Sequence, residues 1–182
     1  MTYSYQILPP TALSDSTIQT ILRLWQVAEW NGMNAGTFRE LFSASEFHLL
    51  IEVDTGTLQC IARINRAFTL KIEEDLHTFA ELVGLVAAER GKGHGKKLMQ
   101  QICHNLRERK IESIGFCNGA LRPFYEACGV TVLRDRARYI YEQADAAWAP
   151  SEDDDVLDIN LLPENVTRLR ALNEHNVAYF VV

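Results

Sequence analysis

Hydrophobic positions alternate with polar ones at the start of the chain and then recur at helical spacing. The segment Tyr3–Leu8 alternates, which predicts a first strand, and the Pro-Pro pair behind it ends that strand. A broad apolar stripe then predicts a helix that begins near Ser14 or Ser16 and runs to about Trp30, with a short helix after it at 37–42. The stripe consists of Ile18, Ile21, Leu22, Leu24, Trp25 and Val27.

The middle of the chain has the pattern of an antiparallel meander. Short apolar runs rich in β-branched residues are separated by turn residues and polar stretches, as in hairpins. The expected elements are a strand at 47–53, a tight turn at 54–57, a partner strand at 58–72, a polar stretch at 73–77 and a further strand at 78–87.

The second half adds one strand–helix–strand unit and then more strands. We expect a helix at 95–109, a strand at 111–117, a short helix at 121–127, a closing hairpin of 130–133 with 138–141, an acidic loop at 151–155, a short strand at 157–161, a helix at 163–173 with proline first, and a last strand at 178–182. This order predicts a mixed α/β (α+β) single domain rather than a regular alternation of strands and helices.

The composition is that of an ordinary globular protein. The 182 residues are 47% hydrophobic and 23% charged, which is enough for one domain with a buried core. The net charge of −6 argues against a nucleic-acid partner and leaves room for a cationic one. No apolar run reaches the roughly 18 residues of a membrane span, and the N-terminus lacks a basic region before an apolar one. We therefore expect a cytoplasmic protein with no membrane partner.

Cysteines and histidines do not form a metal pattern. No C-x-x-C pair occurs, so we expect no metal and reduced, mostly buried thiols. The cysteines are Cys60, Cys103, Cys117 and Cys128. We interpret Cys117 as a packed core thiol, and His94 and His104 as non-catalytic.

The stretch LVAAERGKGHGKKLMQQICHNL, from Leu85 to Leu106, has glycines at every second position where a predicted strand gives way to a helix. A Walker loop would need glycine at Arg90 and serine or threonine at Lys97, so that motif fails. The dinucleotide fingerprint would need glycine at Lys96 and fails too.

The pattern that remains is R-x-x-G-x-G, formed by Arg90, Gly93 and Gly95. Glycines let a backbone turn sharply and approach a ligand, and the N–H groups at a helix start favour phosphate. Positive charge is added by Arg90, Lys92, Lys96 and Lys97. The spacing thus indicates a phosphate site, although a glycine-rich turn with a solvated basic face would have the same pattern.

A second segment, NGALRPFYEACGV, begins at Asn118, where the next strand ends; Phe124, Tyr125 and Gly129 follow at fixed spacing. The two segments together resemble the GNAT superfamily of acetyl-CoA-dependent N-acetyltransferases, which carry R-x-x-G-x-G and N-x-x-x-x-x-F-Y-x-x-x-G. The resemblance covers roughly residues 79–141. Two departures are Ala87, where proline is usual, and His94, where an apolar residue is usual; neither removes a backbone donor.

The resemblance implies a GNAT-like fold, with a mixed, mostly antiparallel central sheet flanked by helices. It implies an N-acetyltransferase domain at 1–150, and we expect 151–182 to be a C-terminal extension packed on the same domain. It also implies acetyl-CoA as co-substrate, with backbone N–H groups near Leu85 and Val86 holding the acetyl oxygen. The implied coenzyme-binding residues are Leu85, Val86, Arg90, Gly91, Lys92, Gly93, His94, Gly95, Lys96, Asn118 and Phe124.

For the chemistry, the resemblance implies that Tyr125 lies near the thioester sulfur. A free phenol has a pKa of about 10, close to that of a thiol, so Tyr125 suits the role of general acid. Glu81 lies nine residues before Arg90 on the entering strand and is our candidate base, although a surface carboxylate is an equally simple interpretation. Some aminoglycoside 2′-N-acetyltransferases have a glutamate at this offset and an acidic C-terminal strand segment, which is a weaker resemblance.

These observations predict transfer of an acetyl group to a primary amine of a small molecule. We expect a cationic acceptor because acidic residues cluster at 73–75 and 152–155, although both runs would also suit solvated loops. Two alternatives stay open: a protein lysine or N-terminal acetyltransferase, and a catalytically silent acyl-CoA-binding domain. Whether the protein is a monomer or a homodimer also stays open.

Overall fold

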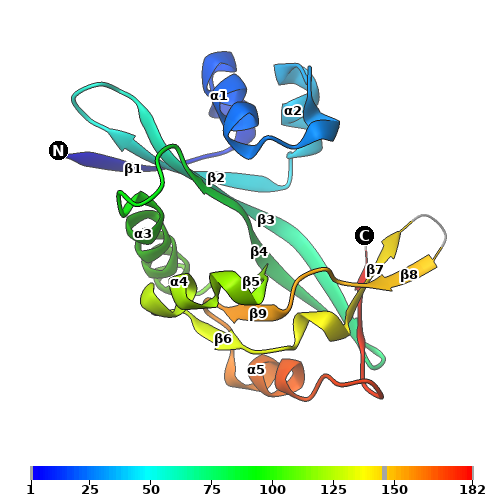
Figure 1. Ribbon diagram of the computed structural model, residues 1–182. Coiled ribbons are helices and arrows are strands. Elements are labelled where there is room, and N and C mark those ends of the chain that lie inside the picture. The colour runs from blue at the N-terminus through cyan, green and yellow to red at the C-terminus, as the bar shows by residue number, and fades with distance from the viewer. Residues whose placement is uncertain (1, 145–146, 182) are drawn as a thin grey trace. The chain divides into compact units, whose positions relative to one another are not determined.

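The computed structural model describes residues 2–144 and 147–181 (Figure 1). The chain divides into two units, one made of Met1–Arg66 and Leu82–Ile102, the other of Ala67–Glu81 and Cys103–Val182. It passes from one unit to the other within three elements. These are strand β3 (Leu58–Ile72), strand β4 (Asp75–Ala87) and helix α3 (His94–Glu108).

The first unit contains an antiparallel set of strands at the start of the sheet. Strand β1 (Tyr3–Leu8) pairs with β2 (Ser45–Glu52), and β2 pairs in turn with β3. Gly56 lies in the connection between β2 and β3 with a φ of +68°, a conformation that glycine adopts without strain. The predicted meander is thus confirmed in this part of the chain.

Helix α1 (Asp15–Trp25) begins where the sequence predicts it. Its N-cap is Ser14, whose hydroxyl accepts a hydrogen bond from the backbone N–H of Thr17 at 3.1 Å. The expected extension to Trp30 is wrong, because Gln26 adopts the left-handed conformation (φ 55°) and ends the helix. A separate 3₁₀ turn follows at Ala28–Trp30.

Helix α2 (Ala35–Leu41) lies beside α1 in the first unit (Figure 1). Both helices turn apolar side chains toward β2 and β3, and this burial provides most of the stability of such amphipathic helices. The buried cluster consists of Leu13, Ile18, Ile21, Phe38, Phe42, Phe47, Leu49 and Ile61.

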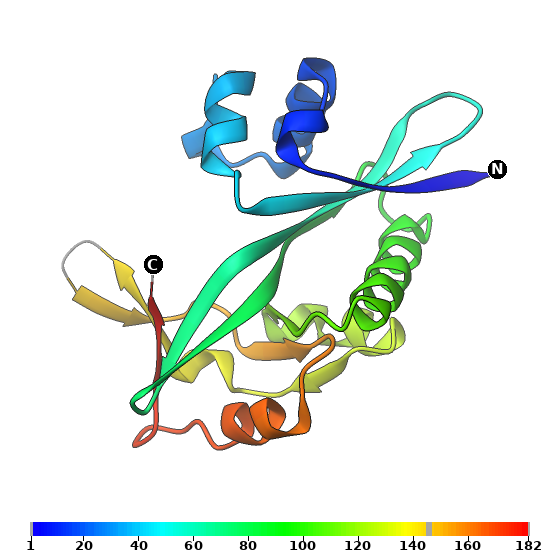
Figure 2. The same ribbon diagram turned by 180° about the vertical axis from the view of Figure 1, so that it is seen from behind.

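The strands of the second unit run in the order β6–β9–β5–β4–β3–β10–β7–β8 and can be followed from behind in Figure 2. Besides the parts of β3 and β4, they are β5 (Ser113–Cys117), β6 (Thr131–Leu133), β7 (Ile140–Ala144), β8 (Ala147–Pro150), β9 (Asp155–Asp158) and β10 (Ala178–Val181). Strand β10 is antiparallel to β3 and parallel to β7, whereas β9 is antiparallel to both β5 and β6.

The predicted closing hairpin of 130–133 with 138–141 is wrong. Strand β6 pairs with β9, and β7 pairs with β8 and β10. The chain between β6 and β7 contains Asp135 in the left-handed conformation (φ 58°) and a 3₁₀ turn at Ala137–Tyr139. The backbone N–H of Asp135 donates to the carboxylate of Asp155 at 2.8 Å, so this segment is held by β9 and not by a hairpin partner.

Two helices complete the second unit. Helix α4 (Arg122–Ala127) follows a 3₁₀ turn at Gly119–Leu121, and α5 (Pro163–Arg170) has proline first, as predicted, but ends three residues earlier than expected. The apolar core of this unit consists of Phe68, Leu70, Ile72, Phe79, Ile114, Leu133, Ala137, Ile140, Val156, Leu169, Leu172 and Ala178.

The mixed α/β class and the mostly antiparallel sheet with flanking helices are confirmed. The segment after residue 150 supplies strands β9 and β10, and β9 lies between β5 and β6 in the sheet order. The division into a domain at 1–150 and an extension at 151–182 stays a prediction.

Candidate functional site

The glycine loop connects β4 to α3 in the first unit (Figure 1). Gly91 and Gly93 have φ values of +77° and +78°, which L-residues rarely adopt. A Cβ atom built on either would meet no atom within 4 Å among the described residues. The conformation of the loop, and not crowding, therefore requires glycine, and the loop leaves an open surface. The backbone N–H of Ala88 anchors its start by donating to the carbonyl of Gln59 at 2.9 Å.

His94 is the first residue of α3, and its side chain packs inward. The residue is 8% exposed, its Nε2 lies 3.1 Å from the hydroxyl of Tyr3, and the Lys97 ammonium lies 4.4 Å above the Tyr3 ring. The imidazole therefore contacts β1. The exposed positive residues on the loop and at the start of the helix are Arg90, Lys92, Lys96 and Lys97.

The end of β4 is irregular at Gly84, where φ is +65°. The indole Nε1–H of Trp25 donates a hydrogen bond to the Gly84 carbonyl at 2.7 Å. The next two residues, Leu85 and Val86, are half-buried, and Val86 packs against the aromatic cluster of the first unit. The sequence pattern shows Trp25 only as part of an apolar stripe, because periodicity does not indicate which group an indole N–H contacts.

Tyr125 lies on α4 in the second unit and is 7% exposed. Burial raises the pKa of its phenol, and nearby Cys117, Cys128 and Asp153 raise the pKa further. The expected match between a free phenol and a thiol therefore does not hold in the folded chain. Tyr125 instead keeps its proton over a wide pH range. Its ring lies edge-on to Phe124, with centroids 5.0 Å apart.

The acidic segment near the C-terminus lies beside β5 and α4. Asp155 pairs in register with Cys117 and is fully buried. Its carboxylate accepts two hydrogen bonds from Arg122, both 2.8 Å long. Burial acts to raise the pKa of Asp155, but the Arg122 guanidinium and the Asp135 N–H outweigh it, so that the pKa is lowered. Asp155 is thus ionised, and the Arg122 guanidinium balances its charge. This ion pair connects α4 to β9.

Asp154 and Asp153 have different surroundings. The backbone N–H of Asp154 donates to the Cys117 carbonyl at 3.1 Å, and its carboxylate accepts from the Gly119 N–H at 2.7 Å and from Arg138 at 3.0 Å. Asp153 is half-buried, and within the described residues no hydrogen bond or ion pair reaches its carboxylate. Its pKa is raised by burial and then by the carboxylates of Glu142, Asp154, Glu152 and Asp155.

The remaining predicted site residues are also in the second unit. Glu81 is half-buried on β4. Asn118 is exposed, and its side-chain oxygen accepts from the Ala120 N–H at 3.1 Å, which begins the turn before α4. Phe124 is half-buried next to Tyr125. The structure thus brings Asn118, Phe124 and Tyr125 together with the acidic segment in the second unit. The glycine loop belongs to the first unit.

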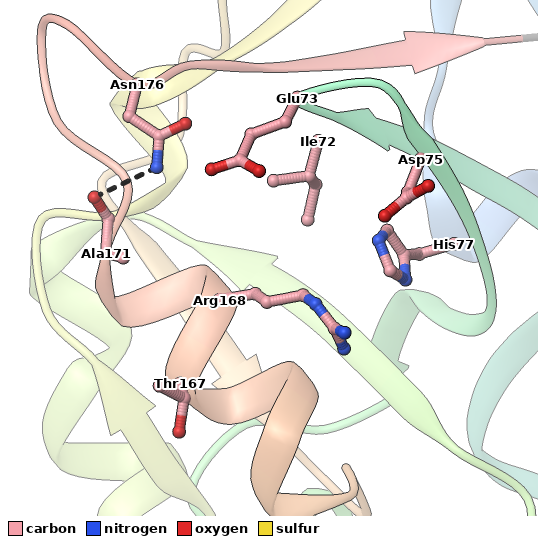
Figure 3. A pocket seen from close by; sticks show the side chains of 8 residues that line it. All are labelled: Ile72, Glu73, Asp75, His77, Thr167, Arg168, Ala171 and Asn176. Atoms are coloured by element: carbon pink, nitrogen blue, oxygen red, sulfur yellow. Dashed lines mark hydrogen bonds between the residues drawn. The ribbon is translucent and has the colours of Figure 1, made fainter.

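The other acidic run, at the turn between β3 and β4, borders a cavity of about 190 Å³ (Figure 3). Figure 3 shows the carboxylates of Glu73 and Asp75 on one side and Arg168 from α5 on the other. The lining is completed by Ile72, His77, Thr167, Ala171 and Asn176. None of these was a predicted catalytic or coenzyme residue, but Glu73 and Asp75 belong to the acidic run 73–75 from which a cationic acceptor was expected.

Three thiols of the described residues are poor nucleophiles at neutral pH, because burial holds them protonated. Burial raises the pKa of the thiols of Cys60 and Cys117 to about 12, and that of Cys103 to about 11. Among residues 2–144 and 147–181, no group of three or more His, Cys, Asp or Glu side chains could hold a metal ion. In the same ranges, no helix is both long and apolar enough to cross a membrane.

Comparison with known proteins identifies the family of this chain. A family model described as the acetyltransferase (GNAT) family matches residues 17–130, more than half of the chain. The chain belongs to this family, and the predicted resemblance is confirmed. The family is one of acetyltransferases, so the chain is an acyltransferase. No curated protein is similar enough in sequence to count as a match.

Solved structures with the same fold include several acetyltransferases. Glucosamine-6-phosphate N-acetyltransferase from Arabidopsis thaliana superposes with a TM-score of 0.54 at 18% identity, over 72% of this chain and 92% of that one. An N-acetyltransferase from Staphylococcus aureus Mu50 gives 0.54 at 12%, over 87% and 99%. The catalytic domain of the Tetrahymena GCN5 histone acetyltransferase, solved with coenzyme A, gives 0.53 at 11%, over 88% and 94%. At these identities the similarity shows a shared fold.

Proposed function

We propose that the protein transfers the acetyl group of acetyl-CoA directly to a primary amine of a small cationic molecule, with Tyr125 as acid and Glu81 as base. The observation that carries the proposal is the surroundings of Tyr125. A buried phenol that holds its proton lies beside a carboxylate segment with unneutralised charge, at the end of β5. Under this proposal, the proton donor and the surface that binds the ammonium group would both belong to the second unit.

The coenzyme would bind at the glycine loop and at the end of β4. Its phosphates would accept from the backbone N–H groups of residues 91–95, with Arg90, Lys92 and Lys96 adding charge. The acetyl oxygen would accept from the N–H groups of Leu85 and Val86. His94 would contribute its backbone, because its imidazole packs against Tyr3.

In the reaction, the neutral amine attacks the thioester carbonyl carbon and forms a tetrahedral intermediate. The carbon–sulfur bond then breaks, and the sulfur leaves as coenzyme A with the proton of Tyr125. The base takes the proton that the amine loses, and Tyr125 regains its proton from solvent. The raised pKa makes Tyr125 a weaker acid than a free phenol, so its proton would move only when thiolate charge has developed.

A second carboxylate competes with Glu81 for the role of base. Asp153 is half-buried, its pKa is raised by burial and by neighbouring carboxylates, and it interacts electrostatically with Tyr125. A carboxylate whose pKa is raised accepts a proton more readily at neutral pH. Glu81 has in its favour its place on the strand that leads to the acetyl site.

The acceptor is assigned as cationic because of the charge around Asp153. Arg122 neutralises Asp155, and Arg138 is shared between Asp154 and Asp135. Asp153 has neighbouring carboxylates and no such partner within the described residues, so negative charge remains in excess. An ammonium group placed there would relieve this repulsion.

The test is release of the coenzyme A thiol over a panel of amines that differ in charge, with a lysine-containing peptide included. For a cationic small molecule, kcat/KM should fall steeply as ionic strength rises, because charge attraction is screened over about 8 Å at physiological salt. Asp153→Asn should reduce that salt slope. Glu73→Gln, in the other acidic run, is the matched control and should leave it unchanged.

Three outcomes would contradict the proposal. A best substrate that is neutral or anionic, or a salt-independent rate, would remove the cationic acceptor. A preference for the peptide would favour a protein acetyltransferase. Binding of acetyl-CoA with no thiol release to any amine would favour a silent acyl-CoA-binding domain.

A further inference from the structure

The indole of Trp25 holds the backbone of β4 at Gly84. The Nε1–H group donates to the Gly84 carbonyl at 2.7 Å. Gly84 has a φ of +65°, and a Cβ atom built there would lie 2.6 Å from Nε1 and 2.9 Å from Cε2 of the same indole. Glycine is therefore required at this position both by its conformation and by the close approach of Trp25.

This hydrogen bond sets the direction of the next N–H group. The Gly84 carbonyl and the Leu85 N–H belong to the same peptide unit, and the described chain contains no cis peptide bond. In a planar trans peptide the C=O and N–H bonds point in opposite directions. Because the oxygen is bound to Trp25, the Leu85 N–H must point away from the indole.

We propose that Trp25 is a positioning residue that aims the Leu85 N–H at the acetyl carbonyl oxygen of acetyl-CoA. This inference rests on the proposed function, which assigns that N–H to the acetyl oxygen. A hydrogen bond accepted at the carbonyl end of a peptide also polarises its N–H, which becomes a better donor. Negative charge grows on the acetyl oxygen in the transition state, so a fixed donor contributes most there.

The indole itself has little freedom to move, because aromatic rings surround it. A donor held by packing does not need to be ordered again in each catalytic cycle. The ring centroids nearest to Trp25 belong to Phe42 at 5.8 Å, Phe47 at 6.1 Å, Phe38 at 6.3 Å and Trp30 at 5.4 Å. Trp30 belongs to the same cluster, but among the described residues its indole makes no hydrogen bond, which makes it a matched control.

The experiment compares Trp25→Phe with Trp30→Phe in calorimetric titrations of two ligands. One ligand is coenzyme A; the other is a ketone isostere of acetyl-CoA in which a methylene replaces the thioester sulfur, so that only this ligand has the acetyl carbonyl. Trp25→Phe should bind coenzyme A within about twofold of the native protein but lose roughly three- to tenfold in affinity for the isostere. Trp30→Phe should leave the ratio of the two affinities unchanged.

Kinetics add a second readout. Removing a whole oxyanion donor costs about 10²–10³ in kcat, so loosening one should lower kcat by roughly tenfold while the KM for acetyl-CoA changes little.

In the native protein, the Trp25 indole N–H should exchange with solvent at least about tenfold more slowly than that of Trp30, and this measurement does not depend on any variant folding.

Any of three results would overturn the positioning role. Trp25→Phe could lose the same affinity for both ligands, Trp30→Phe could show the same change in the affinity ratio, or the two indole N–H groups could exchange equally fast. The failure of this role can be told from that of the proposed function. If no amine is acetylated but the affinity ratio shifts as expected, the transfer reaction is wrong and the role of Trp25 stands. If amines are acetylated and the ratio does not shift, the reaction stands and Trp25 is only a packing residue.

Discussion

Replacing Gly93 by alanine should weaken coenzyme binding while leaving the protein folded. Gly93 has a φ of +78°, and Gly32, far along the chain from the loop, has a φ of +79°. A Cβ atom at either position meets nothing within 4 Å in the part of the chain that the structure describes. Gly32→Ala therefore imposes the same backbone strain without touching the loop, and it is a matched control.

The two variants should lose the same small amount of stability. Placing alanine in the left-handed conformation costs about 1–2 kcal/mol, and the loss of chain freedom in the unfolded state offsets about 0.4–1 kcal/mol of this. The net cost is about 1 kcal/mol, which lowers Tm by roughly 2–4 °C in a chain of this length. Thermal unfolding of both variants measures this and checks that they fold.

Only Gly93→Ala should affect the coenzyme. Its methyl group would stand on the open surface of the loop, where the proposed phosphate contacts are. A lost hydrogen bond to a charged group is worth about 1.5–3 kcal/mol, so the Kd for coenzyme A should rise by roughly 10- to 100-fold. Calorimetry should find native affinity for Gly32→Ala. If Gly93→Ala binds coenzyme A as tightly as Gly32→Ala, the assignment of the loop is wrong.

Two further predictions concern the chemistry. Tyr125→Phe should keep the affinity for acetyl-CoA within about twofold and lose roughly 10²–10⁴ in kcat, and full activity in steady-state assays would remove Tyr125 as the acid. A base works in its deprotonated form, so the rate should fall as pH drops through the pKa of that base. If Asp153 is the base, this acidic limb of the pH–rate profile should lie above the usual aspartate pKa of about 3.9, because the pKa of Asp153 is raised. The acidic limb should flatten in Glu81→Gln if Glu81 is the base, and in Asp153→Asn if Asp153 is the base. If both variants keep the limb, neither residue is the base.

Local features of this fold could be predicted from the sequence, because their causes are local. Ser14 caps α1 through a bond to a residue three positions away, and the glycines of the loop adopt conformations that their own lack of a side chain permits. The sequence pattern predicts a short helix around Tyr125, and the structure confirms that Tyr125 lies on α4; its role as acid stays a prediction.

Long-range pairings could not be predicted in this way. The expected hairpin after α4 failed because the carboxylate of Asp155, about twenty residues further along, binds the backbone of Asp135. The same holds for the contact of Asp154 with Gly119 and for that of Trp25 with Gly84. Alternating apolar residues show which face of an element is buried, but they do not name the partner strand. The position of the acidic segment beside β5 and α4 could therefore not be predicted from its charge.

The buried thiols have a practical consequence for measuring this enzyme. Release of coenzyme A can be followed with a chromogenic disulfide reagent, which reacts with thiolates and not with protonated thiols. At pH 8, a thiol whose pKa is about 11, as for Cys103, is ionised in about one molecule in a thousand, and Cys60 and Cys117 are ionised still less. A free thiol of ordinary pKa is about one quarter ionised at that pH. The product would therefore react with the reagent long before these three side chains, so that they need not be replaced for a continuous assay.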